Sequence, residues 1–196
     1  MITMQQIEIK RKFFDVIEKL GDRSMKVQRK NDIYFLKDYG DDREGFDTFV
    51  DRLQKFKVCG VKTPKVYLYD KNQRIVVMDF IEGESMDEYL SKQDLNDDLY
   101  KLLFDTYWLA KQDKIYLEFK PENFKFSNGK LFYLPFRYKK FVDNQSFLNK
   151  DLKFWFATEE LENYILSRGL EFDHSRIKSE YEINKFMALM SIKYYR

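Results

Sequence analysis

The residues of this chain that are best suited to chemistry lie at positions 116–123, which read Tyr-Leu-Glu-Phe-Lys-Pro-Glu-Asn. Glu118 supplies a carboxylate, a group that can accept a proton. Pro121 lacks a backbone N–H and stops a helix from running through this segment. We therefore predict that these polar residues lie on a loop.

A β-hairpin is predicted directly after this loop. Asn128 and Gly129 form the strongest short hairpin signal, because both turn positions of such a hairpin require a positive φ. Apolar residues alternate at a spacing of two on both sides of the turn. They are Phe124 and Phe126 before it, and Leu131, Tyr133 and Pro135 after it.

This loop and hairpin resemble the catalytic loop of protein kinases, which reads His-Arg-Asp-Leu-Lys-Pro-Glu-Asn and precedes a hairpin and an Asp-Phe-Gly triplet. Residues 120–123, Lys-Pro-Glu-Asn, match that motif as they stand. Glu118 falls at the position of the catalytic aspartate, and Tyr116 at that of the histidine. The triplet falls on residues 135–137, Pro-Phe-Arg, so both key carboxylates of the kinase motif are altered.

The resemblance implies that Glu118, Lys120 and Asn123 form the catalytic set, with Asn123 also a magnesium ligand. The longer glutamate side chain shifts its oxygens by about an ångström, a displacement that can cost roughly a hundredfold in rate. Pro135 supplies no carboxylate for a metal. The sequence therefore argues against bound Mg²⁺, unless a displaced carboxylate such as Asp143 substitutes for the missing one.

A strand with an unusual lysine is predicted at positions 33–39. Ile33, Phe35, Lys37 and Tyr39 alternate along it and share one face. A lysine in line with apolar residues must reach water or find an anionic partner. By resemblance, Lys37 matches the third-strand lysine that holds the α- and β-phosphates of ATP in kinases.

Two further segments resemble nucleotide-binding parts of kinases. Gly21 and Ser24 fall in a degraded phosphate-binding loop, although kinases have several glycines there. Residues 77–85 resemble the hinge of small atypical kinases. There Met78 would line the adenine pocket, and the backbone from Asp79 to Ile81 would hydrogen-bond the base.

Residues 42–59 carry apolar side chains at helical spacing. In kinases, a glutamate on this helix pairs with the strand lysine. Aligned from the Gly-x-x-x-Pro turn at residues 60–64, that position falls near Phe49. Glu44, Asp47 and Asp51 are the alternative carboxylates, and the sequence does not choose among them.

The remaining elements complete the expected fold. Residues 4–20 have helical spacing and end at Gly21, which predicts an amphipathic helix, whereas the resemblance makes their end the first strand. Strands are expected at 65–69 and 74–81. Helices are expected to follow Ser85, Asn96 and Thr158, and to close the chain. We expect an α+β, two-lobed, protein-kinase-like fold. Its antiparallel-sheet N-lobe would span residues 1–81, and its mostly helical C-lobe residues 82–196.

The composition narrows the class of protein. The chain has 196 residues, 44% hydrophobic residues and a net charge of +2, so charge alone indicates neither a nucleic-acid nor a membrane partner. Its one cysteine excludes an internal disulfide, which favours a reducing, cytoplasmic setting. No apolar run approaches the roughly 20 residues of a membrane span. One histidine and one cysteine make a zinc site a poor interpretation.

Three functions follow as expectations. The first is a kinase-like domain of the small atypical branch, which includes the RIO kinases, the kinase of the tRNA-threonylcarbamoylation complex and the aminoglycoside phosphotransferases. It would bind ATP with lost or weakened phosphotransfer and regulate an unidentified protein partner. The second is an active kinase that uses Glu118, Asn123 and Lys37 on an unidentified acceptor. The third is a scaffold or nucleic-acid-binding module, suggested by the basic, aromatic segments 137–141 and 192–196.

Overall fold

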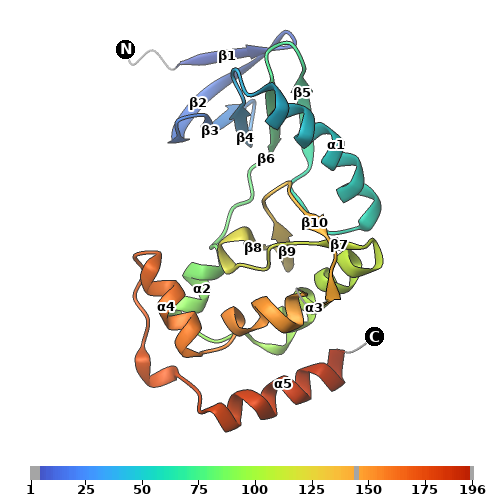
Figure 1. Ribbon diagram of the computed structural model, residues 1–196. Coiled ribbons are helices and arrows are strands. Elements are labelled where there is room, and N and C mark those ends of the chain that lie inside the picture. The colour runs from blue at the N-terminus through green and yellow to red at the C-terminus, as the bar shows by residue number, and fades with distance from the viewer. Residues whose placement is uncertain (1–4, 144–145, 195–196) are drawn as a thin grey trace. The chain divides into compact units, whose positions relative to one another are not determined.

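The structure is a computed structural model, and it describes residues 5–143 and 146–194. Contacts divide the chain into two compact units. Unit 1 comprises Met1–Lys55 and Thr63–Glu82, and unit 2 comprises Phe56–Lys62 and Gly83–Arg196. Unit 1 contains an antiparallel sheet, and unit 2 contains most of the helices, which confirms the α+β class (Figure 1).

Unit 1 is built on one six-stranded sheet, in the order β1-β2-β3-β4-β6-β5. All of its neighbouring strands pair antiparallel. The strands are β1 (Gln6–Ile9), β2 (Lys12–Gly21), β3 (Ser24–Arg29), β4 (Asp32–Asp38), β5 (Val66–Asp70) and β6 (Ile75–Asp79).

The helix expected at residues 4–20 is wrong, because β1 and β2 form a hairpin there. Lys10 and Arg11 close its turn with positive φ angles of 49° and 61°. Phe14 is fully buried on β2, whereas Phe13 and Ile17 are 56% and 46% exposed. The residues at helical spacing are therefore mostly outward-facing strand residues. Pairing with β1 and β3 decided the conformation, as tertiary context often does.

The two faces of the sheet bury different sets of residues. Tyr34 and Leu36 of β4 belong to a small core that also contains Ile9, Phe14, Val27, Ile75 and Val77. The opposite face of β4 carries Phe35 and Lys37, which are only partly buried. The predicted alternation of side chains along this strand is confirmed. The hydrophobic core of the sheet, however, lies on the face that carries Tyr34 and Leu36, and not on the face that carries Lys37.

The expected helix at residues 42–59 is confirmed as α1 (Arg43–Cys59). Phe46 and Phe49 pack against Tyr39, with ring centroids 5.7 and 6.1 Å apart. Because Tyr39 continues the alternation of Lys37, the unit 1 part of α1 covers the face of the sheet that carries this lysine.

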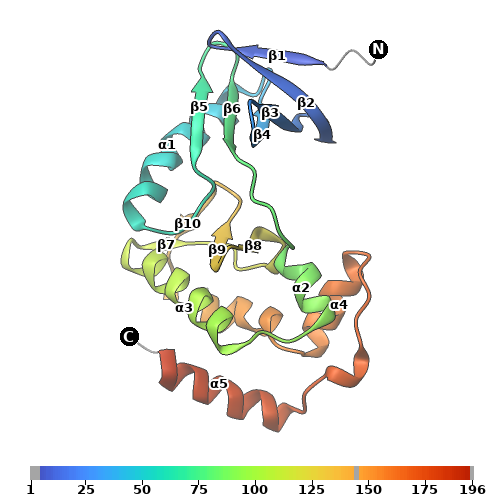
Figure 2. The same ribbon diagram turned by 180° about the vertical axis from the view of Figure 1, so that it is seen from behind.

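Unit 2 is organised around an aromatic core that includes Phe104, Phe119, Phe124, Phe147 and Trp155. Figure 2 shows its helices from behind. The regular helices are α2 (Met86–Lys92), α3 (Asp97–Gln112), α4 (Glu159–Ser167) and α5 (Glu180–Tyr194). The short elements are β7 (Ile115–Tyr116), η1 (Pro121–Asn123), β8 (Phe124–Ser127), β9 (Lys130–Tyr133), β10 (Lys139–Lys140), η3 (Phe147–Asp151), η4 (Leu152–Trp155) and η5 (His174–Arg176).

The predicted helix starts in unit 2 are confirmed. The side chain of Asn96 accepts a hydrogen bond from Leu99 N at 2.9 Å, and that of Thr158 accepts one from Leu161 N at 3.1 Å. The backbone N–H of Ser85 donates to Glu88 at 3.0 Å. These bonds satisfy backbone groups that a helix end leaves free.

The predicted hairpin is confirmed as β8 and β9, with φ angles of 49° at Asn128 and 71° at Gly129. Gly83, just before α2, is also required by geometry. Its φ is 118°, and a Cβ there would lie 2.6 Å from the carbonyl oxygen of Phe126. The start of α2 can therefore approach the hairpin backbone only because residue 83 is glycine.

No helix within residues 5–143 and 146–194 combines the length and apolar character needed to cross a membrane.

Candidate functional site

Two buried side chains, those of Asp151 and Trp155, form hydrogen bonds to the loop at residues 116–123. The carboxylate of Asp151, which is 2% exposed, accepts hydrogen bonds from the Tyr116 hydroxyl and, at 3.3 Å, from Phe119 N. The indole N–H of Trp155 donates to the carbonyl oxygen of Phe119 at 2.8 Å. Both backbone polar groups of Phe119 are thus satisfied, which fixes the loop beside Glu118.

Burial is the largest influence on the pKa values of Asp151 and Tyr116. It raises the pKa of Asp151, while the hydrogen bonds from Tyr116 and Phe119 act to lower it. Burial, and then the bond to Asp151, raises the pKa of Tyr116 far above that of a free tyrosine. Tyr116 therefore remains a protonated donor, so the residue at the kinase histidine position has a structural role here.

Sequence reasoning missed Asp151 and Trp155. Their segment forms a π-helical turn, η3, followed by a 3₁₀ turn, η4, so it has neither helical nor strand periodicity. The available signal was one acid four residues before a tryptophan in an aromatic stretch.

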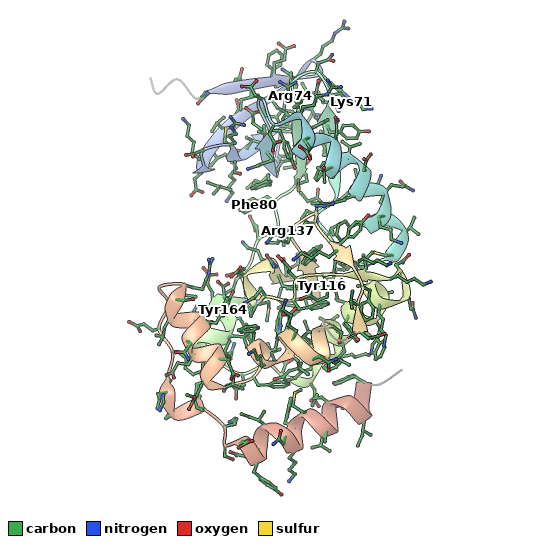
Figure 3. The ribbon with its side chains drawn as sticks, in the orientation of Figure 1. Lys71, Arg74, Phe80, Tyr116, Arg137 and Tyr164 are labelled. Carbon is green, nitrogen blue, oxygen red and sulfur yellow. The ribbon has the colours of Figure 1, made fainter. Side chains whose placement is uncertain are left out.

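Glu118 is held in two ion pairs. Its Oε2 lies 2.9 Å from Nη2 of Arg137, and its Oε1 lies 3.3 Å from Nζ of Lys139. Figure 3 labels Arg137 and Tyr116 in unit 2. Arg137 is the third residue of the segment that resembles Asp-Phe-Gly. Each oxygen of the Glu118 carboxylate therefore already has a cationic partner.

The side chains of Asn123 and Lys120 both contact other residues of unit 2. Asn123 is 5% exposed, and its Nδ2 donates to the carbonyl oxygen of Glu118 at 3.0 Å. Nζ of Lys120 lies 3.8 Å from the ring centroid of Phe154 and 5.2 Å from that of Tyr164. The Lys120 ammonium therefore makes cation–π contacts, which favour its present position.

We expect Lys120→Met to lower the free energy of unfolding of unit 2 by about 0.5–2 kcal/mol, because methionine keeps the apolar contact and loses the cation–π attraction. Denaturant titration followed by tryptophan fluorescence would measure this, since both tryptophans lie in unit 2. Lys101→Met, at an exposed position on α3, is the matched control. Equal losses in the two variants would show that the rings contribute nothing specific.

Glu122 belongs to a separate polar cluster beside the loop. The Tyr164 hydroxyl donates to its carboxylate, and burial raises the pKa of that tyrosine. Nε of Arg168 lies 3.5 Å from Glu122 and 3.4 Å from Asp87. Oδ1 of Asp87 is the buried side-chain polar atom without a hydrogen-bond partner among the described residues. The cluster links the loop to α2 and α4.

In unit 1 the structure brings Lys37 and Ser24 together. Nζ of Lys37 lies 3.3 Å from Oγ of Ser24, and the two residues face each other across β3 and β4. Gly21 ends β2 in open space, where a Cβ would meet no atom within 4 Å. Packing therefore does not require glycine at this position.

Within residues 5–143 and 146–194, Lys37 forms no ion pair with a carboxylate. The three candidate helix carboxylates, Glu44, Asp47 and Asp51, are all exposed, and Asp47 pairs with Arg43 at 3.6 Å. Phe49, at the aligned glutamate position, is 4% exposed and packs against Tyr39. The structure does not select a substitute for the kinase glutamate.

The segment that resembles a hinge lies at the end of β6. Met78 is 6% exposed within the sheet. The N–H of Asp79 already donates to the carbonyl oxygen of Lys65 at 2.9 Å. Any base that binds here would therefore have to use the Asp79 carbonyl or the backbone of Phe80 and Ile81.

The basic, aromatic segment at 137–141 turns its rings into unit 2. Tyr138 packs edge-on to Phe56 with centroids 5.8 Å apart, and Phe141 lies 6.5 Å from Tyr107. In the second such segment, Tyr194 stacks on Phe104 at 5.0 Å, and residues 195–196 lie outside the described part of the chain. Among the residues of these two segments that the structure describes, there is no row of exposed rings of the kind on which bases stack.

The residues present do not fit a magnesium site of the kind the resemblance implies. Pro135 has no donor side chain, and the nearby carboxylate of Glu118 is paired with cations. Asp143 is exposed, and its side chain has no described contact with the loop. No cluster of three or more His, Cys, Asp or Glu side chains forms a metal site in the described ranges.

No protein-family model matches this chain, and no curated protein sequence matches it.

Proposed function

We propose that this chain is a kinase-like domain of the small atypical branch that binds ATP and has lost or weakened phosphotransfer. It would act as a pseudokinase-type regulator or interaction module for a protein partner. The observation that carries this proposal is the pairing of Glu118 with both Arg137 and Lys139. The carboxylate at the catalytic position is thereby paired with Arg137, from the segment that resembles Asp-Phe-Gly, and with Lys139, two residues beyond it.

The order of elements supports the kinase-like part of the proposal. The strand with Lys37 is followed by α1, then by β5 and β6, and then by the segment that resembles a hinge. After it come α2, the long α3, the loop and the β8–β9 hairpin. This is the order that the resemblance implies, and the main motif lies on the expected loop.

The charges support weakened catalysis. Phosphoryl transfer depends on positioning and on neutralising charge on the transferred group, a task that metal ions share in kinases. Here Pro135 offers no ligand, whereas the exposed side chains of Arg137 and Lys139, which pair with Glu118, bring positive charge to its neighbourhood. We therefore expect nucleotide binding that does not require magnesium.

One observation favours the active kinase as a second candidate. Asn123 donates from Nδ2 to Glu118, while its Oδ1 accepts no hydrogen bond from any described residue. An oxygen at this position remains available to a cation that arrives with the nucleotide. In this alternative, Glu118→Ala would abolish magnesium-dependent turnover. Unchanged turnover in Glu118→Ala would exclude Glu118 as the base.

We expect ATP to raise the melting temperature with and without Mg²⁺, and Lys37→Ala to remove most of the shift. A ligand at a hundredfold excess over Kd stabilises the native state by about 2.7 kcal/mol, which is several degrees for a chain of this size. Differential scanning fluorimetry with an ATP titration would measure this.

Lys19→Ala is the matched control for this titration, because it removes an exposed lysine of β2 in the same unit. A shift that needs Mg²⁺ would favour the active kinase. No shift at saturating ATP would reject the nucleotide-binding part of the proposal, and the search would turn to protein partners.

A further inference from the structure

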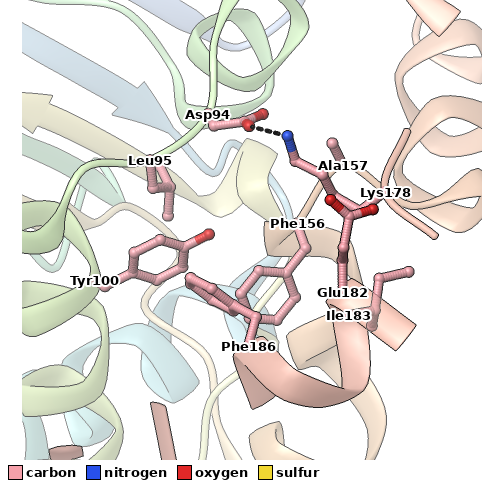
Figure 4. Close-up of a pocket in the computed structure, with 9 residues that line it drawn as sticks. All are labelled: Asp94, Leu95, Tyr100, Phe156, Ala157, Lys178, Glu182, Ile183 and Phe186. Carbon is pink, nitrogen blue, oxygen red and sulfur yellow. Dashed lines mark ion pairs between the residues drawn. The ribbon is translucent and has the colours of Figure 1, made fainter. Parts of the chain in front are cut away.

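A half-open cavity of about 270 Å³ lies between α5 and the body of unit 2 (Figure 4). It is separate from the loop at residues 116–123. Three rings, those of Tyr100, Phe156 and Phe186, form its aromatic part, and Leu95, Ala157 and Ile183 complete its apolar lining. Asp94, Lys178 and Glu182 lie at its polar side.

The three rings form an incomplete aromatic cage. Tyr100 stacks on Phe156 with centroids 5.5 Å apart and an interplanar angle of 26°. Phe186 stands edge-on to Phe156 at 4.6 Å and lies 5.1 Å from Tyr100. A flat aromatic ligand would add a further ring in the offset or edge-to-face geometry that such rings favour.

The polar side chains that line the cavity already have ion-pair or hydrogen-bond partners within the protein. The two oxygens of Asp94 pair with Arg176 at 2.8 Å and with Lys178 at 3.6 Å. Glu182 accepts hydrogen bonds from the backbone and hydroxyl of Ser179, at 2.9 and 2.7 Å. Lys178 is the one cation among the residues that line the cavity, and it is paired with Asp94, so an anionic ligand would find no unpaired counter-ion here.

The Tyr100 hydroxyl also has a partner, because it donates a hydrogen bond to the carbonyl oxygen of Trp155 at 2.9 Å. It therefore presents its ring, and not a free donor, to the cavity. The volume exceeds the roughly 150 Å³ of an apolar cavity that accommodates benzene. A one- or two-ring molecule matches both this size and the apolar lining.

We propose that this cavity is a binding site for a small, uncharged aromatic molecule. The ligand would insert its ring among Tyr100, Phe156 and Phe186, and contact Ile183 of α5. This site goes beyond the proposed nucleotide-binding function and does not depend on it.

The test uses indole as the probe and methyl NMR of the whole chain as the readout. We expect saturable shifts of the Ala157 and Ile183 methyl signals as indole is added to the wild type. Ile183→Trp would fill the cavity and weaken indole binding by at least about tenfold, read from Ala157. Ile192→Trp is the matched control, because Ile192 is 79% exposed on the same helix and does not line the cavity.

A second variant, Phe186→Leu, tests the site independently in case Ile183→Trp does not fold. Phe186→Leu keeps the site apolar but removes one ring, so indole binding should weaken while the melting temperature stays near that of the wild type. Weak binding in Ile183→Trp and Phe186→Leu, with normal binding in Ile192→Trp, supports the site. Shifts that do not saturate, or that persist equally in all variants, would overturn it. Saturable binding of benzoate as tight as that of indole would overturn the preference for uncharged ligands.

Discussion

Replacing Asp151 by alanine is expected to lower the free energy of unfolding of unit 2 by about 2–5 kcal/mol. The change leaves the Tyr116 hydroxyl and the Phe119 N–H buried without their acceptor, at a cost of about 1–3 kcal/mol each. Denaturant titration followed by tryptophan fluorescence would measure the loss, because Trp155 contacts the same loop. We also expect the loop to lose protection from amide hydrogen exchange at Phe119.

Two further variants separate this role from a general effect of removing an acid. Asp143→Ala, at an exposed position, should change stability by less than about 0.5 kcal/mol. Asp151→Asn keeps an oxygen acceptor and should retain most of the stability lost in Asp151→Ala. Equal losses in Asp143→Ala and Asp151→Ala would refute the anchoring role of Asp151.

The stability contributed by Asp151 should depend on pH in a defined direction. Burial raises its pKa in the folded chain above the ordinary value of 3.8. The part of its contribution that comes from this pKa shift is therefore fully present below 3.8 and is lost as the pH rises through the raised value, whereas the hydrogen-bond acceptors remain. Relative to Asp151→Asn, the wild type should lose stability over that window, which unfolding measurements at a series of pH values would show.

The second large effect is expected from changing residues 135–137 to the Asp-Phe-Gly triplet that they resemble. The double variant Pro135→Asp with Arg137→Gly supplies the missing carboxylate and removes one cation from Glu118. Because one stabilising group is commonly worth about 10²–10³ in rate, we expect magnesium-dependent ATP turnover to rise by about that factor. Release of labelled phosphate, with and without Mg²⁺, would measure it.

The control is Pro135→Asn with Arg137→Gly, which matches the aspartate in shape and lacks its charge. This control should leave turnover near the wild-type level. If both double variants behave alike, the loss of a carboxylate at position 135 does not explain weakened catalysis. If the wild type already turns over ATP as fast as the aspartate variant, the proposal of lost or weakened phosphotransfer fails.

The sequence determined the elements whose signals are local. The Asn128-Gly129 turn, the caps at Asn96 and Thr158, and the apolar spacing of α1 each act within a few residues, and the structure confirms them. The alternation around Lys37 is confirmed for the same reason, because opposite faces of a strand follow from its backbone geometry. Pro121 does prevent a continuous helix, since it begins only a single 3₁₀ turn, η1, which ends at Asn123.

Only the tertiary structure decided the parts that depend on distant partners. Residues 6–21 became strands because β3 and the turn at Lys10 and Arg11 completed a sheet, which helical spacing alone could not reveal. The partners of Glu118 come from positions 19 and 21 residues later in the chain. Asp151 and Trp155 lie 32 and 36 residues from Phe119, in a segment without regular periodicity. Side-chain contacts over such separations depend on packing, so the motif could be found from the sequence while its neutralised carboxylate could not.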